Sequence, residues 1–289
     1  MMSGAPPYPA QPTPGLGSSF LTATDIAEFL DLWLSNELLD GEAARTFTAY
    51  YGSYAKSFSP RIRRLYAGQI REAEKVLENN PSASVLEVGC GLGTESLWLA
   101  LKGGEVRAVD VRQDRVNTAV ARQRVLETEI GRPVDCAFFC GSFLELNDDE
   151  AFDLIWMEQA FHHLEPRRDV VQKTATLLKP GGHLVISEAN ALNPLLQLEL
   201  FIRRGVPRVA MQQGPGGTDH PYGVERVTSA MNLVKMFERV GIRRVGVRHY
   251  RMFPNSPLFD RLAGVEDVLA WNALGPLLTN FNYVGEKAV

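Results

Sequence analysis

The stretch VLEVGCGLGTES, residues 85–96, decides how this chain folds. Residues 85–88 form a short apolar run broken by one acid, which is typical of a strand buried on both faces of a parallel sheet. Three glycines at alternate positions follow, and they allow a tight turn whose backbone can approach a ligand closely. Thr94 then opens a helix. A strand, a glycine turn and a helix N-terminus in this order predict a binding site for a polar, partly anionic small molecule.

The spacing of the glycines separates three kinds of nucleotide site. A dinucleotide site of the G-x-G-x-x-G type that starts at Gly89 and Gly91 requires glycine at position 94, where this chain has Thr94. A phosphate-binding P-loop requires a lysine, and residues 82–100 contain none. The pattern that remains is E-x-G-x-G-x-G at residues 87–93.

Two features further along the chain accompany the glycine turn. An apolar strand expected at 106–110 ends in Asp110, 23 positions after Glu87, where a doubly wound fold places a carboxylate that accepts both hydroxyls of a ribose. Asp110 could also cap the helix expected after it, and the two roles are compatible. The sequence LKPGG at 178–182 ends a helix and turns the chain into an apolar strand at 183–187.

Together, residues 87–93, Asp110 and the LKPGG segment resemble the motifs of the class I S-adenosylmethionine (AdoMet) methyltransferases, in particular small-molecule enzymes of the ubiquinone and menaquinone type. The resemblance covers residues 82–190, with a looser match at the C-terminal strands. It implies AdoMet as the cofactor. It also implies an α/β fold with a Rossmann-like, doubly wound, seven-stranded sheet whose last strand is antiparallel.

The resemblance also implies a set of cofactor-binding residues. These are Glu87, Gly89, Cys90, Gly91, Gly93, Asp110, Val111, Ser142, Phe143 and Glu158. In this scheme Glu87 lies near the cofactor amino group, Phe143 borders the adenine and Glu158 lies near the methionine moiety. Related families usually carry an acid at position 142, and the hydroxyl of Ser142 accepts a hydrogen bond from the adenine amino group more weakly.

The end of the fourth expected strand supplies candidate catalytic residues. His162 resembles, by its position, the base histidine of plant small-molecule O-methyltransferases, although many relatives have His-His-Leu without this use. On a helix, His163 cannot face the same way as its neighbour His162, and it is expected to pack near the substrate. Glu188 could hold the tautomer of His162 and stabilise the imidazolium. Alternatively, Glu188 could neutralise an arginine such as Arg203 or Arg204.

Four residues are expected to contact the substrate or form a lid: Tyr50, Tyr54, His163 and Asn190. Tyr50 and Tyr54 lie about one helical turn apart, and they either pack the N-terminal helices onto the main domain or lie over the cofactor pocket. The second interpretation follows from aromatic helices in related methyltransferases. Asn190, two residues after Glu188, is expected to point to the same side as that carboxylate.

Composition restricts the partners and the compartment. The chain has 289 residues, a net charge of −4 and a pI near 5.8, so it lacks the basic field expected of a nucleic-acid-binding protein. Its three cysteines favour free thiols in a reducing compartment. No apolar run approaches the about 20 residues of a membrane span, and the start does not resemble a signal peptide. We therefore expect a cytoplasmic protein, with a homodimer as one oligomeric state. No magnesium is expected, because no Asp-Asp-Asn constellation of the catechol type is evident.

The predicted domains follow changes in composition. Residues 1–20 are rich in Pro, Gly and Ser and predict a mobile tail, and 21–80 predict a cap of three helices, the first capped by Thr24. Residues 81–289 then form the AdoMet-binding domain with insertions at 191–227 and 253–275. The first insertion contains an apolar helix and a Gly-rich stretch at 212–223 that predicts a mobile loop.

The expected function is AdoMet-dependent methylation of a small, largely apolar acceptor at oxygen or carbon, such as a secondary metabolite, a quinone or a lipid-like molecule. The apolar helix of the first insertion supports an apolar acceptor, because insertions at this edge shape the acceptor pocket or a lid. The alternatives are an AdoMet-fold protein that does not methylate, such as a cyclase or binding module, and a dinucleotide oxidoreductase.

Overall fold

The computed structural model describes residues 15–147, 151–213, 219–253, 257–270 and 274–289. Within these ranges, seven strands form one sheet in the order β3-β2-β1-β4-β5-β9-β8. The strands are β1 (Ser84–Val88), β2 (Glu105–Asp110), β3 (Cys136–Cys140), β4 (Phe152–Glu158), β5 (Leu178–Ala189), β8 (Ile242–Tyr250) and β9 (Asn280–Lys287). Strands β1 to β5 pair in parallel, and β9 runs antiparallel between β5 and β8. The predicted doubly wound sheet with an antiparallel last strand is confirmed.

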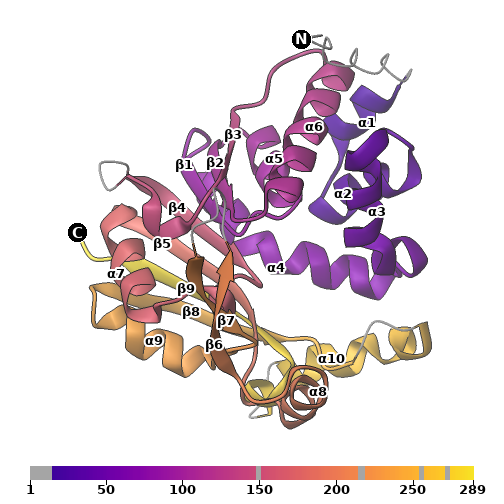
Figure 1. Cartoon of the computed structure of the whole chain (residues 1–289). Helices are drawn as coiled ribbons and strands as arrows, with labels where there is room; N and C mark the ends of the chain where they lie inside the picture. Colours follow the sequence, from indigo (N-terminus) through magenta and orange to yellow (C-terminus); the bar gives the residue numbers. More distant parts are fainter. Residues whose placement is uncertain (1–14, 148–150, 214–218, 254–256, 271–273) are drawn as a thin grey trace.

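Helices cover both faces of this sheet (Figure 1). One face packs against the N-terminal helices α1 (Leu16–Thr22), α2 (Ile26–Ser35), α3 (Gly41–Lys56) and α4 (Pro60–Asn79), together with α5 (Thr94–Leu101) and α6 (Gln113–Ile130). The other face packs against α7 (Arg167–Leu177) and α9 (Ala230–Glu238). Alternate residues of each strand enter opposite cores, as the twofold period of a strand requires: Val85 joins the first core and Leu86 the second.

The N-terminal helices share a single apolar core with the sheet. Phe29 and Trp33 of α2 are buried in the same cluster as Trp98 of α5 and Trp156 of β4. Two details of the sequence prediction are wrong here. The expected tail to residue 20 is already helical from Leu16, because Phe20 is buried against these rings; residues 1–14 lie outside the described ranges. Asp25, rather than Thr24, caps α2 by accepting the backbone N–H of Glu28.

The first insertion folds into a helix and a hairpin. Helix α8 (Pro194–Arg204) is followed by β6 (Arg208–Gln213) and β7 (Asp219–Val224), which pair antiparallel in a small sheet of their own. The flanks of the predicted mobile loop at 212–223 are therefore strands, because the hairpin hydrogen bonds satisfy their backbone groups. Its centre, 214–218, lies outside the described residues. In Figure 1 the hairpin stands beside the carboxyl ends of the central strands.

The second insertion contains short helices, η4 (Pro257–Leu262), α10 (Ala263–Ala270) and η5 (Gly275–Leu277). Arg61 of α4 ties it to the N-terminal helices through an ion pair with Glu266, whose Oε1 lies 2.9 Å from Nη1, and both side chains are buried. Asp260 lies 3.4 Å from Arg61 Nε on the same side. None of the helices in the described ranges is long and apolar enough to span a bilayer.

Candidate functional site

The glycine turn after β1 adopts the backbone that the sequence predicts. Gly89 and Gly91 have φ of 78° and 52°, values that residues with a side chain rarely adopt. A Cβ on Gly89 would lie 2.6 Å from the Cβ of Ala160, so the turn packs directly against the segment after β4. The N–H groups of Gly89 and Cys90 both donate to the carbonyl of Val109, at 2.8 and 3.1 Å. The turn is thereby joined to the end of β2.

Asp110 is the last residue of β2, and its carboxylate accepts backbone N–H groups from the glycine turn and from the residues after β2. Its Oδ2 accepts the N–H of Gly91 at 3.0 Å, and its Oδ1 accepts the N–H of Arg112 at 2.8 Å. The carboxyl group is buried, with Arg115 Nη1 3.9 Å from Oδ2. Because each carboxylate oxygen has a further lone pair, Asp110 can still accept ligand hydroxyls.

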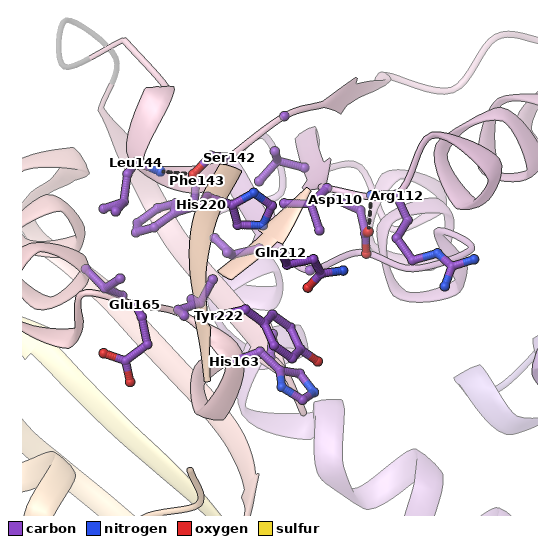
Figure 2. A pocket seen from close by; sticks show the side chains of 18 of the residues that line it. Asp110, Arg112, Ser142, Phe143, Leu144, His163, Glu165, Gln212, His220 and Tyr222 are labelled. Atoms are coloured by element: carbon purple, nitrogen blue, oxygen red, sulfur yellow. Dashed lines mark hydrogen bonds between the residues drawn. The ribbon is translucent and has the colours of Figure 1, made fainter. Parts of the chain in front are cut away.

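A first cavity of about 220 Å³ lies at the carboxyl ends of β1, β2 and β4. Figure 2 shows Asp110, Ser142 and Phe143 on one side and residues of the β6–β7 hairpin across from them. The hairpin contributes Gln212, His220, Pro221 and Tyr222 to the wall. This is the switch point of the strand order between β1 and β4, where doubly wound sheets bind ligands.

The cavity fits the adenosine end of AdoMet. Asp110 and Val111 lie on the side where a ribose would bind, and buried Phe143 offers an apolar ring for a base. The hydroxyl of Ser142 accepts the N–H of Leu144 at 3.3 Å, so its own proton stays available to a ligand. Gly89, Asp110, Val111, Ser142 and Phe143 thus line this cavity as the sequence predicts.

The other expected cofactor residues lie outside this wall. Glu87 is buried, and its carboxylate accepts the hydroxyl of Ser96 in α5. Burial and the nearby Glu95 carboxylate raise the pKa of Glu87 well above its usual value. Cys90 is also buried, and burial raises the pKa of its thiol. The contacts of Glu87 and Ser96 support the strand–helix junction, and the expected approach of Glu87 to a cofactor amino group remains a prediction.

His163 lines the first cavity and is more than a packing residue. Its Nδ1 lies 2.8 Å from the carbonyl oxygen of Gly223, which places the proton on Nδ1 and leaves Nε2 as an acceptor. Its ring stacks on Tyr222 with 4.5 Å between centroids and 15° between planes. Burial and the neighbouring His162 lower the pKa of His163 to about 4, so the ring is neutral at physiological pH. The pair joins the hairpin to the segment after β4.

His162 does not line the first cavity. Its Nδ1 lies 2.8 Å from Glu188 Oε2, its backbone N–H donates to Glu188 Oε1 at 3.2 Å, and its Nε2 lies 4.0 Å from Glu225. Burial lowers the pKa of His162, but the charge and hydrogen bond of Glu188 and the charge of Glu225 outweigh it and raise the pKa above its usual value. Glu188 therefore pairs with His162, whereas Arg203 and Arg204 pair with Glu199 and Glu225. The contact between Nδ1 and Glu188 is the one expected of a carboxylate that holds the histidine tautomer, and the role of His162 as a base stays a prediction.

Asn190 was expected at the substrate, and this expectation is wrong. Its Nδ2 donates to the carbonyls of Pro276 and Leu278 at 2.7 and 2.8 Å, and its Oδ1 accepts the N–H of Leu192 at 3.1 Å. The side chain is fully buried. Both side-chain N–H groups of Asn190 therefore anchor residues 276–278 to the end of β5.

A second cavity of about 610 Å³ lies on the other side of the carboxyl end of β4. Its wall combines aromatic and aliphatic side chains, among them Tyr54, Ile62, Leu65, Tyr66, Leu196, Met252 and Phe253, with polar ones: Gln69, Glu158, Gln159, Asn193, Glu199, Arg251, Thr279 and Asn280. Gln159, which follows β4 directly, lines both cavities. The two cavities are thus neighbours that share this residue in their walls.

The two tyrosines expected to form a lid lie at different places. The hydroxyl of Tyr50 stands over the glycine turn: a Cβ on Gly91 would lie 2.7 Å from it. Tyr54 lines the second cavity, where its ring lies against Phe58 and Tyr66 with centroids 5.3 and 5.7 Å apart. Each therefore covers a different part of the site, and each also packs within the N-terminal helices.

Some site residues were not singled out individually from the sequence, although Gln159 lies in the segment after the fourth expected strand that supplied candidate catalytic residues. Gln159 has a φ of 48°, unusual for a residue with a side chain and typical of strained functional segments. Gln69 and Tyr250 of the second cavity come from α4 and β8, far apart in the chain. Tyr222 belongs to the hairpin that was expected to be a loop. None of these positions belongs to a local motif, so only their contacts reveal them.

The comparisons with known proteins agree with this architecture. Residues 86–186 match a methyltransferase domain family. The chain is 32% identical over 158 residues to the methyltransferase GfsG of Streptomyces halstedii, covering 53% of this chain and 54% of that protein. It is 28% identical over 181 residues to the ubiquinone biosynthesis O-methyltransferase of Vibrio atlanticus (strain LGP32), covering 61% of this chain and 68% of that one.

A solved structure shares the fold. The magnesium protoporphyrin IX methyltransferase of Synechocystis PCC 6803, crystallised with bound S-adenosylhomocysteine, superposes with a TM-score of 0.54 at 14% identity, over 84% of this chain and 94% of that one. The motif-bearing segment, the strand order and these likenesses agree. They support a class I S-adenosylmethionine-dependent methyltransferase domain, with S-adenosylmethionine as its cofactor.

Proposed function

We propose that this protein transfers the AdoMet methyl group to oxygen or carbon of a small, largely apolar acceptor. The observation that carries the proposal is that two neighbouring cavities share Gln159 in their walls. The first suits the nucleoside end of AdoMet, and the second, at about 610 Å³, has the size of a small-molecule site. A methyl group carried near Gln159 would face an acceptor in the second cavity.

The residues of the chain mainly bind, orient and exclude water. Bound AdoMet supplies an activated methyl group on its sulfonium, so the reaction needs alignment more than further activation. Asp110 would bind the ribose and Phe143 would border the adenine. The hairpin, held by His163 and Tyr222, would cover the nucleoside from solvent.

The walls of the second cavity favour an acceptor with a substantial apolar part. Tyr54, Tyr66 and Phe253 present aromatic faces, and Ile62 and Leu196 add aliphatic surface. A quinone precursor, an aromatic secondary metabolite or a lipid-like molecule fits this chemistry. One relative is named for O-methylation in ubiquinone biosynthesis, which supports an acceptor of this kind.

The proposal extends to compartment and assembly. The cysteines are free, with Cys90 and Cys136 buried, which supports a reducing, cytoplasmic environment. We carry the homodimer forward as a proposal, because α8 exposes apolar side chains such as Leu195 and Ile202, which are 72% and 73% exposed. Light scattering in solution measures the molar mass of the protein and so separates a monomer from a homodimer.

The test uses methyl-labelled AdoMet with an extract of producer cells, analysed by mass spectrometry. We expect a labelled small molecule and release of S-adenosylhomocysteine with turnover. Calorimetry with AdoMet and with NAD separates this proposal from an oxidoreductase. Tight AdoMet binding without any labelled product would favour a non-methylating protein and contradict the proposal.

A further inference from the structure

The second cavity contains a carboxyl group of which only one oxygen is hydrogen-bonded within the part of the chain that the structure describes. Glu158 is the last residue of β4, next to Gln159, which lines both cavities. Its Oε1 accepts the side-chain N–H of Gln69 at 3.1 Å, whereas its Oε2 makes no hydrogen bond to the part of the chain that the structure describes. One carboxylate oxygen is therefore available to a ligand at the point where a methyl group would be transferred.

Oε1 of Glu158 is held by a series of hydrogen-bonded side chains. Gln69 reaches Glu158 from α4, and its Oε1 accepts the hydroxyl of Tyr250 at 3.5 Å. The same hydroxyl lies 2.7 Å from the hydroxyl oxygen of Ser187 on β5. These contacts from three elements restrict the rotation of the carboxyl group, so its second oxygen keeps a defined direction.

A second unsatisfied acceptor lies in the same wall. Asn280, the first residue of β9, is 8% exposed, and its Oδ1 has no hydrogen-bond partner within the described ranges. A buried acceptor without a partner costs about 1–3 kcal/mol. A ligand that donates a hydrogen bond there would recover that cost.

These contacts rest on the proposed function and make it more specific. We propose that Glu158 is the catalytic base and that the acceptor is a hydroxylated aromatic compound, whose reacting hydroxyl donates to Glu158 Oε2 while a second polar hydrogen donates to Asn280 Oδ1. The aromatic faces of Tyr54 and Phe253 bind the ring. This acceptor satisfies both unpaired oxygens at once.

The reaction then balances with the groups already present. The proton of the acceptor hydroxyl passes to the Glu158 carboxylate as the oxygen forms its bond to the methyl carbon, and the electron pair of the breaking carbon–sulfur bond stays on sulfur. The products are an aryl methyl ether, S-adenosylhomocysteine and protonated Glu158, which returns its proton to solvent.

The surroundings tune Glu158 for this role. Burial, with the Glu95 and Glu188 carboxylates, raises the pKa of Glu158 to about 8, opposed by the Gln69 hydrogen bond and by the charge of Arg251. A base with a pKa near the working pH transfers protons efficiently. The other ionisable groups whose charges interact with Glu158 are Tyr50, Tyr54, Glu87 and Tyr250.

The first experiment measures binding of two probes, phenol and catechol, by NMR titration of protein saturated with S-adenosylhomocysteine. The titration is run at pH 9, where Glu158, whose pKa is about 8, is mostly ionised and phenolic groups, which ionise near pH 10, are mostly protonated. Glu158→Gln should weaken both probes about tenfold, because a charged acceptor is lost. Asn280→Leu should weaken catechol, with its second hydroxyl, and leave phenol unchanged. Glu72→Gln in α4, which pairs with Lys75 and lines neither cavity, is the matched charge control and should change neither.

The second experiment follows methyl ether formation from catechol against pH. The wild-type rate should rise with pH and level off above about pH 8, as Glu158 loses its proton. Glu158→Gln should lack this rise and be about 10²–10⁴-fold slower. Calorimetry should show S-adenosylhomocysteine affinity unchanged within about threefold.

The outcomes separate the inference from the function on which it rests. A tenfold loss of S-adenosylhomocysteine affinity in Glu158→Gln would show that Glu158 holds the cofactor instead, and an unchanged rate would remove it as the base. If wild-type protein binds S-adenosylhomocysteine but neither phenol nor catechol, the assignment of the acceptor is wrong, whereas the proposed function is not affected. Wild-type protein that binds no S-adenosylhomocysteine overturns the proposed function as well.

Discussion

The substitution Gly89→Ala tests the glycine turn most directly. An alanine there must adopt the φ of 78°, which costs a residue with a side chain about 1–2 kcal/mol. Its Cβ would also lie 2.6 Å from the Cβ of Ala160, and such overpacking costs about 1–3 kcal/mol. The neighbour is a methyl group fixed to the backbone, so it cannot rotate away. The free energy of unfolding should therefore fall by about 2–5 kcal/mol in total.

The control is Gly131→Ala. Gly131 has a φ of 71°, and a Cβ there would meet no atom within 4 Å. This variant pays the backbone cost alone, about 1–2 kcal/mol. Urea unfolding followed by circular dichroism measures both variants, and calorimetry measures S-adenosylhomocysteine binding, which only Gly89→Ala should weaken. If both variants lose the same stability and bind the ligand equally well, the tight contact between the turn and Ala160 does not exist in solution.

Three further substitutions test other parts of the site. Asp110→Asn should weaken S-adenosylhomocysteine binding about tenfold to a hundredfold, since hydrogen bonds to a charged group contribute about 1.5–3 kcal/mol; calorimetry with unchanged affinity would remove its ribose role. Tyr222→Ala should weaken the same ligand about twofold to tenfold, because an aromatic pair contributes about 0.5–1.5 kcal/mol, whereas Tyr222→Phe keeps the ring and should match wild type. His162→Gln should destabilise the fold at acid pH only. The pKa of His162 is raised in the folded state by Glu188 and Glu225, so its contribution is complete below about pH 6.5 and is lost as pH rises through the raised pKa. Urea midpoints of both proteins at pH 5.5 and 8.5 decide this, and an equal difference at both pH values would contradict it.

Local patterns were sufficient for the framework. The apolar runs at residues 85–88 and 106–110 became central strands, because a strand buried on both faces must be apolar along its whole length. The glycine turn and Asp110 came together because the carboxyl ends of neighbouring parallel strands lie at one edge of the sheet. Val111, Ser142 and Phe143 line the first cavity for the same reason.

Side-chain direction was harder to predict. His162 and His163 are adjacent and chemically equal in the sequence, and their roles depend on which one meets the hairpin and which one meets Glu188. Asn190 was assigned to the substrate from the period of the strand, but the second insertion supplies backbone carbonyls that bind it. In both cases the partner lies at least 25 residues away, so no local pattern could reveal it.

The sequence by itself determined the doubly wound sheet with its antiparallel last strand, the AdoMet fingerprint and the carboxylate at the end of β2. Each of these depends on residues that are neighbours in the chain or follow the fixed topology of the fold. Only the tertiary structure decided that the hairpin lines the first cavity and that Glu158 and Asn280 line the second. Such contacts join α4, β4, β8 and β9, and their geometry depends on how the layers pack, which the order of residues does not state.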